Sequence, residues 1–350
     1  MLNKSKIALL WVAVLLSLAV LLMFPTDCRN GATNGVFLCL QVLIPSLFPF
    51  MILSSFVASS GIIQKVPKVI GSAIKFLFGL PPCAFAPIFL SLIGGYPVGA
   101  TSIKELYRQG HLTKEQSERM AMFCVSAGPG FLITYIGAVM TRNLKLGYLL
   151  LISQIISLFM LGIIAKFWVI PLNEDNTETI NYCKKRNSIK DSVIYSIENA
   201  IKATSSMCAL VVVFSAVSEV FITLCNNNPA IIWLTALIEI TNGTKILADA
   251  YPVVLLAFVC GFGGLCVHFQ IFVQLKDLKI NKCNFYIFRI LQGLLCAIFS
   301  GILIKLFPLT KTVFSTINEA KPEFYTTSIG CVFLVLVCAA FIVCTRQRRI

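Results

Sequence analysis

Charged residues are scarce in this sequence, and histidine is nearly absent. Only 13% of the 350 residues are charged, 57% are hydrophobic, and two are histidines. A soluble protein of this length is about a quarter charged, and several apolar runs here reach the roughly 20 residues that span a bilayer. The mean hydropathy of +0.86 agrees with this. The composition therefore excludes an ordinary soluble domain and predicts an all-α polytopic membrane protein.

Enzyme signatures are also missing. The chain has no H-E-x-x-H helix, no Walker glycine loop with its lysine and no G-x-S-x-G turn, so we expect no catalytic residues, no bound metal and no cofactor. Its 14 cysteines form no C-x-x-C pair and lie mostly inside apolar runs, as small apolar side chains do. A bridge between Cys28 and Cys225, both near the predicted outer face, is conceivable.

Lysine and arginine, in contrast, are plentiful, and the net charge is +14. They occur in short clusters between apolar runs, which is typical of cytoplasmic loops, so no nucleic-acid partner is expected. We expect the lipid bilayer and a small-molecule substrate as partners, and a homo-oligomer is possible. The clusters predict a first span and outer loop at 1–35, a first repeat at 36–170, a cytoplasmic linker at 171–192, a second repeat at 193–282 and C-terminal spans at 283–350.

This arrangement gives about eight full spans with both termini cytoplasmic. The first, at 7–24, follows Lys4 and Lys6 and lacks a cleavage site, so it is expected to remain as a span. An outer loop is predicted from Thr26 to Gly35, and the outer loop at 306–325 has the weakest charge pattern. The last two spans are predicted at 284–307 and 326–344.

The first repeat begins with a span at 36–60 in which Pro45 and Pro49 predict a kink. Basic clusters flank the segment 76–103 on both sides, so we predict a re-entrant hairpin there. Its breaks are expected around Pro81-Pro82 and from Gly94 to Gly99.

Two short cytoplasmic helices are predicted at 102–120, with Thr113 and Gln116 as a capping box and His111 as a solvated turn residue. The next span, 120–141, is broken at Gly128-Pro129-Gly130, and 147–170 returns.

The second repeat resembles the first with opposite direction. A long helix at 193–225 leads to 231–249, which is too polar around Glu239 to face lipid and predicts a second re-entrant hairpin. The following span, 251–275, is broken from Gly261 to Gly264. Two hairpins, each followed by a broken span, favour an inverted-repeat transporter with its site near the midplane. Glycines four apart can also simply let helices pack closely.

Ionisable residues at membrane depth are costly and usually face a cavity or a partner. Glu239 is the best candidate for contacting a substrate or a coupling ion, H⁺ or Na⁺. His268 is expected either to contact substrate or carry protons, or to pack, while Lys245 and Asp249 can pair on one helical turn. Half-helix N-termini expected after Gly99, Gly130, Gly243 and Gly264 would favour an anionic or carbonyl-bearing ligand, and Tyr96 could stack on a planar ring.

The predicted substrate-binding set collects the polar and small residues of these breaks. It comprises Gly94, Gly95, Tyr96, Pro97, Gly99, Thr101, Ser126, Gly128, Pro129, Glu239, Thr241, Asn242, Gly243, Gly263, Gly264, His268 and Gln270. Glu198 and Lys202, four apart, are expected to pair near the cytoplasmic end of their helix.

The motifs GGYPVGA, KELYRQGHLTKEQSER, SAGPGF, EITNG and GFGGLCVHFQ together resemble the sporulation integral membrane proteins with nucleoside-recognition (gate) domains. The resemblance covers roughly 36–275, and Cys266 stands where a small residue such as serine is expected. It implies the inverted-repeat architecture of concentrative nucleoside transporters, and an endospore-forming bacterium. It also implies transport of dipicolinate, a planar aromatic dicarboxylate, towards the forespore.

We therefore expect a transporter of a small planar anionic metabolite in the cytoplasmic membrane or the membrane around the forespore. A nucleoside or nucleobase cation symporter is the first alternative. The second is a membrane scaffold that recruits partners through Arg108, Lys114 and Arg119 and does not transport.

Overall fold

The computed structural model describes residues 11–12, 15, 18–60, 66–168, 189–226, 228, 233–250, 252–278 and 280–308. Two compact units divide the chain, Met1–Leu309 and Thr310–Ile350, and every described residue belongs to the first. The described residues are helical and contain no strand. Most of the predicted linker, most of the predicted loop 306–325 and the predicted span 326–344 lie outside them, as does much of the span 7–24.

The first described elements are α2 (Pro25–Leu38), the π-helix η1 (Cys39–Leu43) and α3 (Ile44–Ser59). Pro25–Leu43 and Leu47–Ser59 meet at 59°, which confirms the predicted proline kink. The predicted outer loop from Thr26 to Gly35 is wrong, because these residues are helical. Their glycines decide this: a Cβ on Gly31 would lie 2.6 Å from the Ser215 carbonyl oxygen, so the helix packs backbone to backbone.

The first predicted hairpin is bent where expected. Helix α4 (Lys68–Phe78) ends at Gly79, and it meets the segment Pro82–Gly94 at 89°. That segment comprises the short 3₁₀ helix η3 (Pro82–Ala84) and α5 (Phe85–Gly94), and α5 packs against α6 (Tyr96–Arg108).

A turn with His111 joins α6 to α7 (Lys114–Phe123), whose capping box between Thr113 and Gln116 is confirmed. His111, predicted to be solvated, is only partly exposed, and the helices on either side of it are largely buried. Most of α6 is buried, as is Arg119 on α7, and His111 is half-buried in a way that lowers its pKa by desolvation. These helices therefore form part of the packed interior.

The predicted span 120–141 is not one helix. Residues 125–128 have no regular secondary structure, and only the π-helix η4 (Gly130–Met140) follows before a short turn and the long α8 (Leu144–Trp168). Gly137 and Gly147 explain the tight return, since a Cβ on Gly147 would lie 2.8 Å from the Leu132 carbonyl oxygen.

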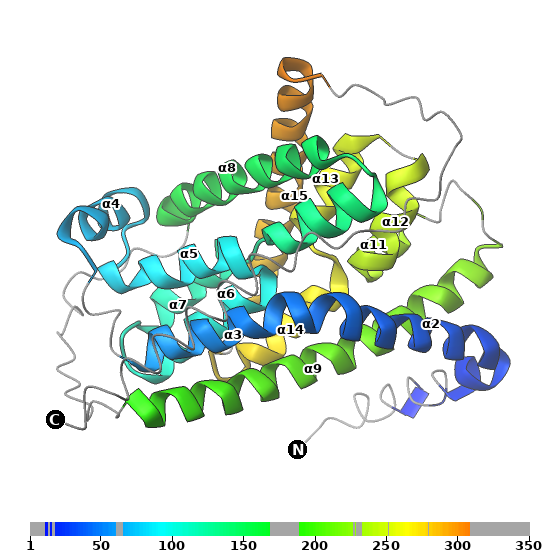
Figure 1. Ribbon diagram of the computed structural model, residues 1–350, viewed down its shortest axis with the longest axis horizontal. Coiled ribbons are helices and arrows are strands. Elements are labelled where there is room, and N and C mark those ends of the chain that lie inside the picture. The colour runs from blue at the N-terminus through cyan, green and yellow to red at the C-terminus, as the bar shows by residue number, and fades with distance from the viewer. Residues whose placement is uncertain are drawn as a thin grey trace, which may run out of the picture. The chain divides into compact units, whose positions relative to one another are not determined.

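The second half begins with the 36-residue α9 (Ile189–Leu224), which runs beside α2 and α3 (Figure 1). It starts within the range predicted as linker. The remaining helices are α11 (Thr235–Ile238), α12 (Ile240–Ala250), α13 (Val253–Phe262), α14 (Gly264–Gln274), η6 (Lys276–Leu278) and α15 (Lys282–Leu306).

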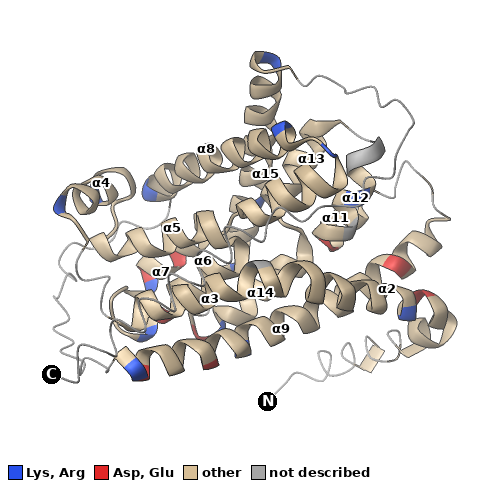
Figure 2. Ribbon diagram, in the orientation of Figure 1, with Lys and Arg blue, Asp and Glu red and all other residues tan. Residues whose placement is uncertain are grey.

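Four segments in the described part of the chain can cross a membrane, or up to six if each bent pair is one span. The four are α8, α9, the α13–α14 segment and α15. Figure 2 shows that their central turns are almost free of charge, with lysine and arginine mainly near helix ends. These apolar helices make the chain an integral membrane protein, although fewer spans are described than the eight predicted.

Candidate functional site

The first hairpin turns at Gly95 and touches the break that follows it. Gly95 has φ 85° and ψ −169°, a conformation that essentially only glycine adopts. A Cβ on Gly128 would lie 2.9 Å from the Gly95 nitrogen, so the two backbones are in direct contact. Ser126 donates a hydrogen bond to the Ser91 carbonyl at 3.2 Å. The sequence-predicted tip and break of the first half are therefore brought together.

The second hairpin turns at Glu239, which lies in extended conformation between α11 and α12. Its carboxylate accepts a hydrogen bond from the Thr241 nitrogen at 3.0 Å and so caps the start of α12. A Cβ on Gly264 would lie 3.2 Å from the Ala236 carbonyl oxygen and 3.4 Å from the Ile240 nitrogen. The second tip thus lies against the second break, as the first tip does against the first.

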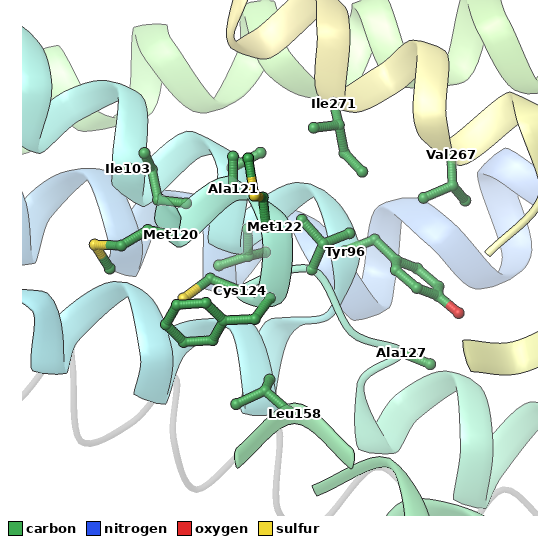
Figure 3. Packing of buried hydrophobic residues seen from close by; sticks show 14 of the residues in the cluster. Tyr96, Ile103, Met120, Ala121, Met122, Cys124, Ala127, Leu158, Val267 and Ile271 are labelled. Carbon is green, nitrogen blue, oxygen red and sulfur yellow. The ribbon is translucent and has the colours of Figure 1, made fainter. Parts of the chain in front are cut away.

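Two tyrosines join these pairs. The Tyr96 hydroxyl donates to the Cys260 carbonyl oxygen on α13, and Tyr135 on η4 donates to the Thr241 carbonyl oxygen at 3.3 Å. Tyr96 is buried at one end of an apolar cluster that also includes Val267 and Ile271 of α14 (Figure 3). Its ring therefore packs between the two halves, with its hydroxyl occupied by a carbonyl.

The predicted half-helix N-termini are correct at two of four breaks. Helix α14 begins at Gly264 and η4 at Gly130, but α6 begins at Tyr96 and α12 at Ile240. Gly99 and Gly243 lie inside their helices, where they permit close packing. A Cβ would lie 2.1 Å from the Cys124 carbonyl oxygen at Gly99, and 2.0 Å from the Ala236 Cα at Gly243.

The remaining predicted residues have local roles in this structure. The Thr101 hydroxyl donates to the Pro97 carbonyl oxygen. Pro97 lies in the first turn of α6, directly after the tip formed by Gly94 and Gly95. Pro129 precedes η4 as its N-cap. Asn242, Lys245 and Asp249 all lie in α12. Lys245 is exposed, and the side chains of Asn242 and Asp249 lie outside the described atoms.

His268 is fully buried among aromatic rings. One ring nitrogen lies 2.8 Å from the Phe262 carbonyl oxygen, and Phe262, Phe285 and Tyr286 contact the imidazole edge-on. Gln270 donates to the Cys266 sulfur at 3.3 Å. This environment favours the packing role for His268. Cys28 and Cys225 are both free thiols.

Sequence reasoning missed Arg289, which is fully buried in the middle of α15. Its guanidinium donates to the carbonyl oxygens of Val125 and Met122, and it lies 5.5 Å from the Phe285 ring centroid. It thereby holds the non-helical segment that leads to the first break. An arginine inside an otherwise apolar run was the available signal.

A second missed group centres on Glu105 of α6, which is 2% exposed. Its carboxylate accepts from Tyr195 on α9 at 3.0 Å and from Gln109 at 2.9 Å. Nearby, Ser54 and Ser102 are hydrogen-bonded, and Asn199 donates to Ser55 at 2.8 Å. These contacts fasten α3, α6 and α9 to one another.

The fold and site define a polytopic integral membrane protein in which the chain bends at Gly95 and at Glu239, each bend lying against a later helix break. Residues 40–142 match the family model named Gate, described as nucleoside recognition. The chain is 24% identical over 344 residues to the sporulation integral membrane protein YlbJ of Bacillus subtilis (strain 168), an alignment that covers 87% of this chain and 84% of that protein. No solved structure matches. The two matches confirm the predicted resemblance to sporulation membrane proteins with gate domains.

Proposed function

We propose that this protein moves a small planar anionic metabolite, similar to dipicolinate, across the membrane through a site at the two helix breaks. The observation that supports this most is the repeated contact of tip and break, Gly95 with Gly128 and Gly264 with the residues around Glu239. Irregular backbone at membrane depth persists where it is enclosed in protein or lines a pathway. Transporters use such discontinuous helices as their binding sites, and we take the two halves to be the inverted repeat that the sequence predicts.

The anionic substrate follows from the charges near the breaks. The starts of η4 and α14 present backbone N–H groups and the positive ends of their helix dipoles. Arg289 on α15 adds a buried cation that contacts the segment leading to Gly128. The relative's role in sporulation suggests the membrane around the forespore as the location, with both termini in the cytoplasm.

Nucleoside or nucleobase transport is the second candidate, and the description of the matched family favours it. That match covers the first tip and break but not Glu239. Because Glu239 is a buried carboxylate that caps α12 at the second break, it is our candidate for coupling to H⁺ or Na⁺ in either case.

The test is uptake of labelled dipicolinate and labelled uridine into proteoliposomes, with wild type, Glu239→Gln and, as control, the exposed Glu115→Gln. We expect dipicolinate uptake in wild type and Glu115→Gln, and a loss of at least about tenfold in Glu239→Gln, since that change removes the negative charge of the buried carboxylate. Uptake of uridine alone would replace the anion with the nucleoside. Flux of neither, in folded protein, would contradict transport of both and favour the scaffold, although Arg119 is buried and unavailable to a partner.

A further inference from the structure

A cavity of about 320 Å³ lies away from the breaks, among α6, α9 and the end of α14. Its volume is at the lower end of the roughly 300–1,000 Å³ typical of small-molecule pockets. Four cations line it, Lys104 and Arg108 from α6, Lys202 from α9 and Lys276 from η6, and the acidic lining residue is Glu198. The cavity therefore carries an excess of positive charge.

In the part of the chain that the structure describes, the four cations are not paired directly with a carboxylate, although Glu105 and Asp277 lie near Lys104. Within the described residues, none of the four forms an ion pair or a hydrogen bond through its side chain. The predicted pairing of Lys202 with Glu198 is accordingly not formed, although both line the cavity. Burial lowers the pKa of Lys104 most, and Arg108 and Lys276 lower it further, while Glu105 and Asp277 act in the opposite direction. The cations therefore lie close enough to repel one another, with two carboxylates nearby.

A polar side chain of the same cavity is also available for a ligand. Gln274, at the end of α14, is 5% exposed and lines the cavity. Among the described residues its amide has no hydrogen-bond partner. Buried amides are normally hydrogen-bonded, so this side chain is suited to bind something that enters the cavity.

We propose that this cavity is an anion-binding site for a small molecule or head group with carboxylate or phosphate oxygens. The half-buried Lys104 and the buried Gln274 would bind its oxygens, with the exposed Arg108, Lys202 and Lys276 adding charge at the rim. An anion offsets the repulsion among the cations and supplies the acceptors that they and Gln274 lack.

The cavity is distinct from the proposed midplane site but shares two helices with it. Helix α6 runs from the tip at Gly95 to Lys104 and Arg108, and α14 runs from the break at Gly264 to Gln274. At 1.5 Å per residue, Lys104 lies roughly 13 Å and Arg108 roughly 20 Å from the tip, and Gln274 lies roughly 15 Å from the break. The two helices contact each other. An anion in the cavity would therefore contact the C-terminal ends of α6 and α14, the two helices that begin at the breaks.

Binding can be tested on the full-length protein in neutral detergent, with citrate and inorganic phosphate as probes and sodium chloride at matched ionic strength as the screening control. The measurement is the thermal unfolding midpoint against probe concentration. We expect a saturable increase with citrate or phosphate and an apparent affinity at least about tenfold weaker in Lys104→Gln and in Lys276→Gln, because each loses a charged contact. The exposed Lys114→Gln on α7 should behave like wild type.

An unchanged affinity in both cavity variants, or an equal response to sodium chloride, would overturn the proposal. Nanodiscs of phosphatidylcholine with and without phosphatidylglycerol then identify the source of the anion. If the wild type loses its citrate response in nanodiscs that contain phosphatidylglycerol, the lipid head group already occupies the cavity. If the response persists in those nanodiscs, the occupant is a soluble anion. Binding is measured without transport, so Glu239→Gln should keep it even where uptake is lost.

Discussion

Arg289 shows how a charge is accommodated inside this apolar bundle. A cation at membrane depth costs several kcal/mol unless polar groups surround it, and Arg289 meets the carbonyls of Met122 and Val125. Met122 is in the last turn of α7, where carbonyl groups lack helical partners. The Arg289 guanidinium thus donates to carbonyl oxygens that have no helical partner, and the non-helical segment before Gly128 is held in place.

Replacing Arg289 with methionine should destabilise the protein, because two buried carbonyl groups would lose their donor. We expect a decrease of at least about 2 kcal/mol in the free energy of unfolding, at about 1–3 kcal/mol for each unsatisfied group. Unfolding in detergent measures it. Lys305→Met, a change at an exposed position of the same helix, is the control, and equal stability of the two variants would contradict this role.

At the scale of elements, small residues decide where helices approach one another. Gly31 lets α2 lie against α9, Gly99 lets α6 reach the Cys124 carbonyl, and Gly243 lets α12 contact α11. These glycines lie inside helices, where glycine is otherwise unfavourable by roughly 1 kcal/mol. Their benefit is the close contact that a side chain would prevent.

Gly243→Ala should therefore force the second hairpin apart, since the added carbon would lie 2.0 Å from the Ala236 Cα. We expect a loss of about 1–3 kcal/mol of stability, the usual cost of overpacking, together with lower uptake of whichever substrate is transported. Gly301→Ala on α15 is a matched control, because its added carbon would meet only Val254 at 3.8 Å. A wild-type midpoint for Gly243→Ala would show that the hairpin does not need this contact.

For the whole molecule, orientation in the membrane follows from the lysines that flank the α14–α15 connection. By the positive-inside rule, Lys276 and Lys282 predict that this connection lies in the cytoplasm, and the free Cys283 beside them is exposed.

A membrane-impermeant maleimide should therefore modify Cys283 in inside-out vesicles and leave it at least about tenfold less modified in right-side-out vesicles. Peptide mapping by mass spectrometry measures the modification, with Cys283→Ser as the control for assignment. Modification from the outer side alone would reverse the orientation of the described helices, and with it the cytoplasmic placement of the basic cavity.

Sequence alone determined the membrane class, the breaks at Gly95, Gly128 and Gly263-Gly264, the proline kink and the capping box. Each of these depends on local chemistry: long apolar runs, glycine conformations, missing proline N–H groups and a side chain three residues from its partner. Glu239 was likewise visible as a carboxylate in an apolar setting.

Only the tertiary structure decided which glycines turn the chain and which let helices pack, because Gly95 and Gly99 look alike until a neighbour is placed beside them. Helix α2 also forms where a loop was predicted, because its polar, turn-like residues pack against α9 in the tertiary structure. The hydrogen-bond partners of Arg289 lie more than 160 residues away along the chain. The cations of the cavity likewise come from α6, α9 and η6. Both arrangements depend on contacts between distant segments, which no local pattern encodes.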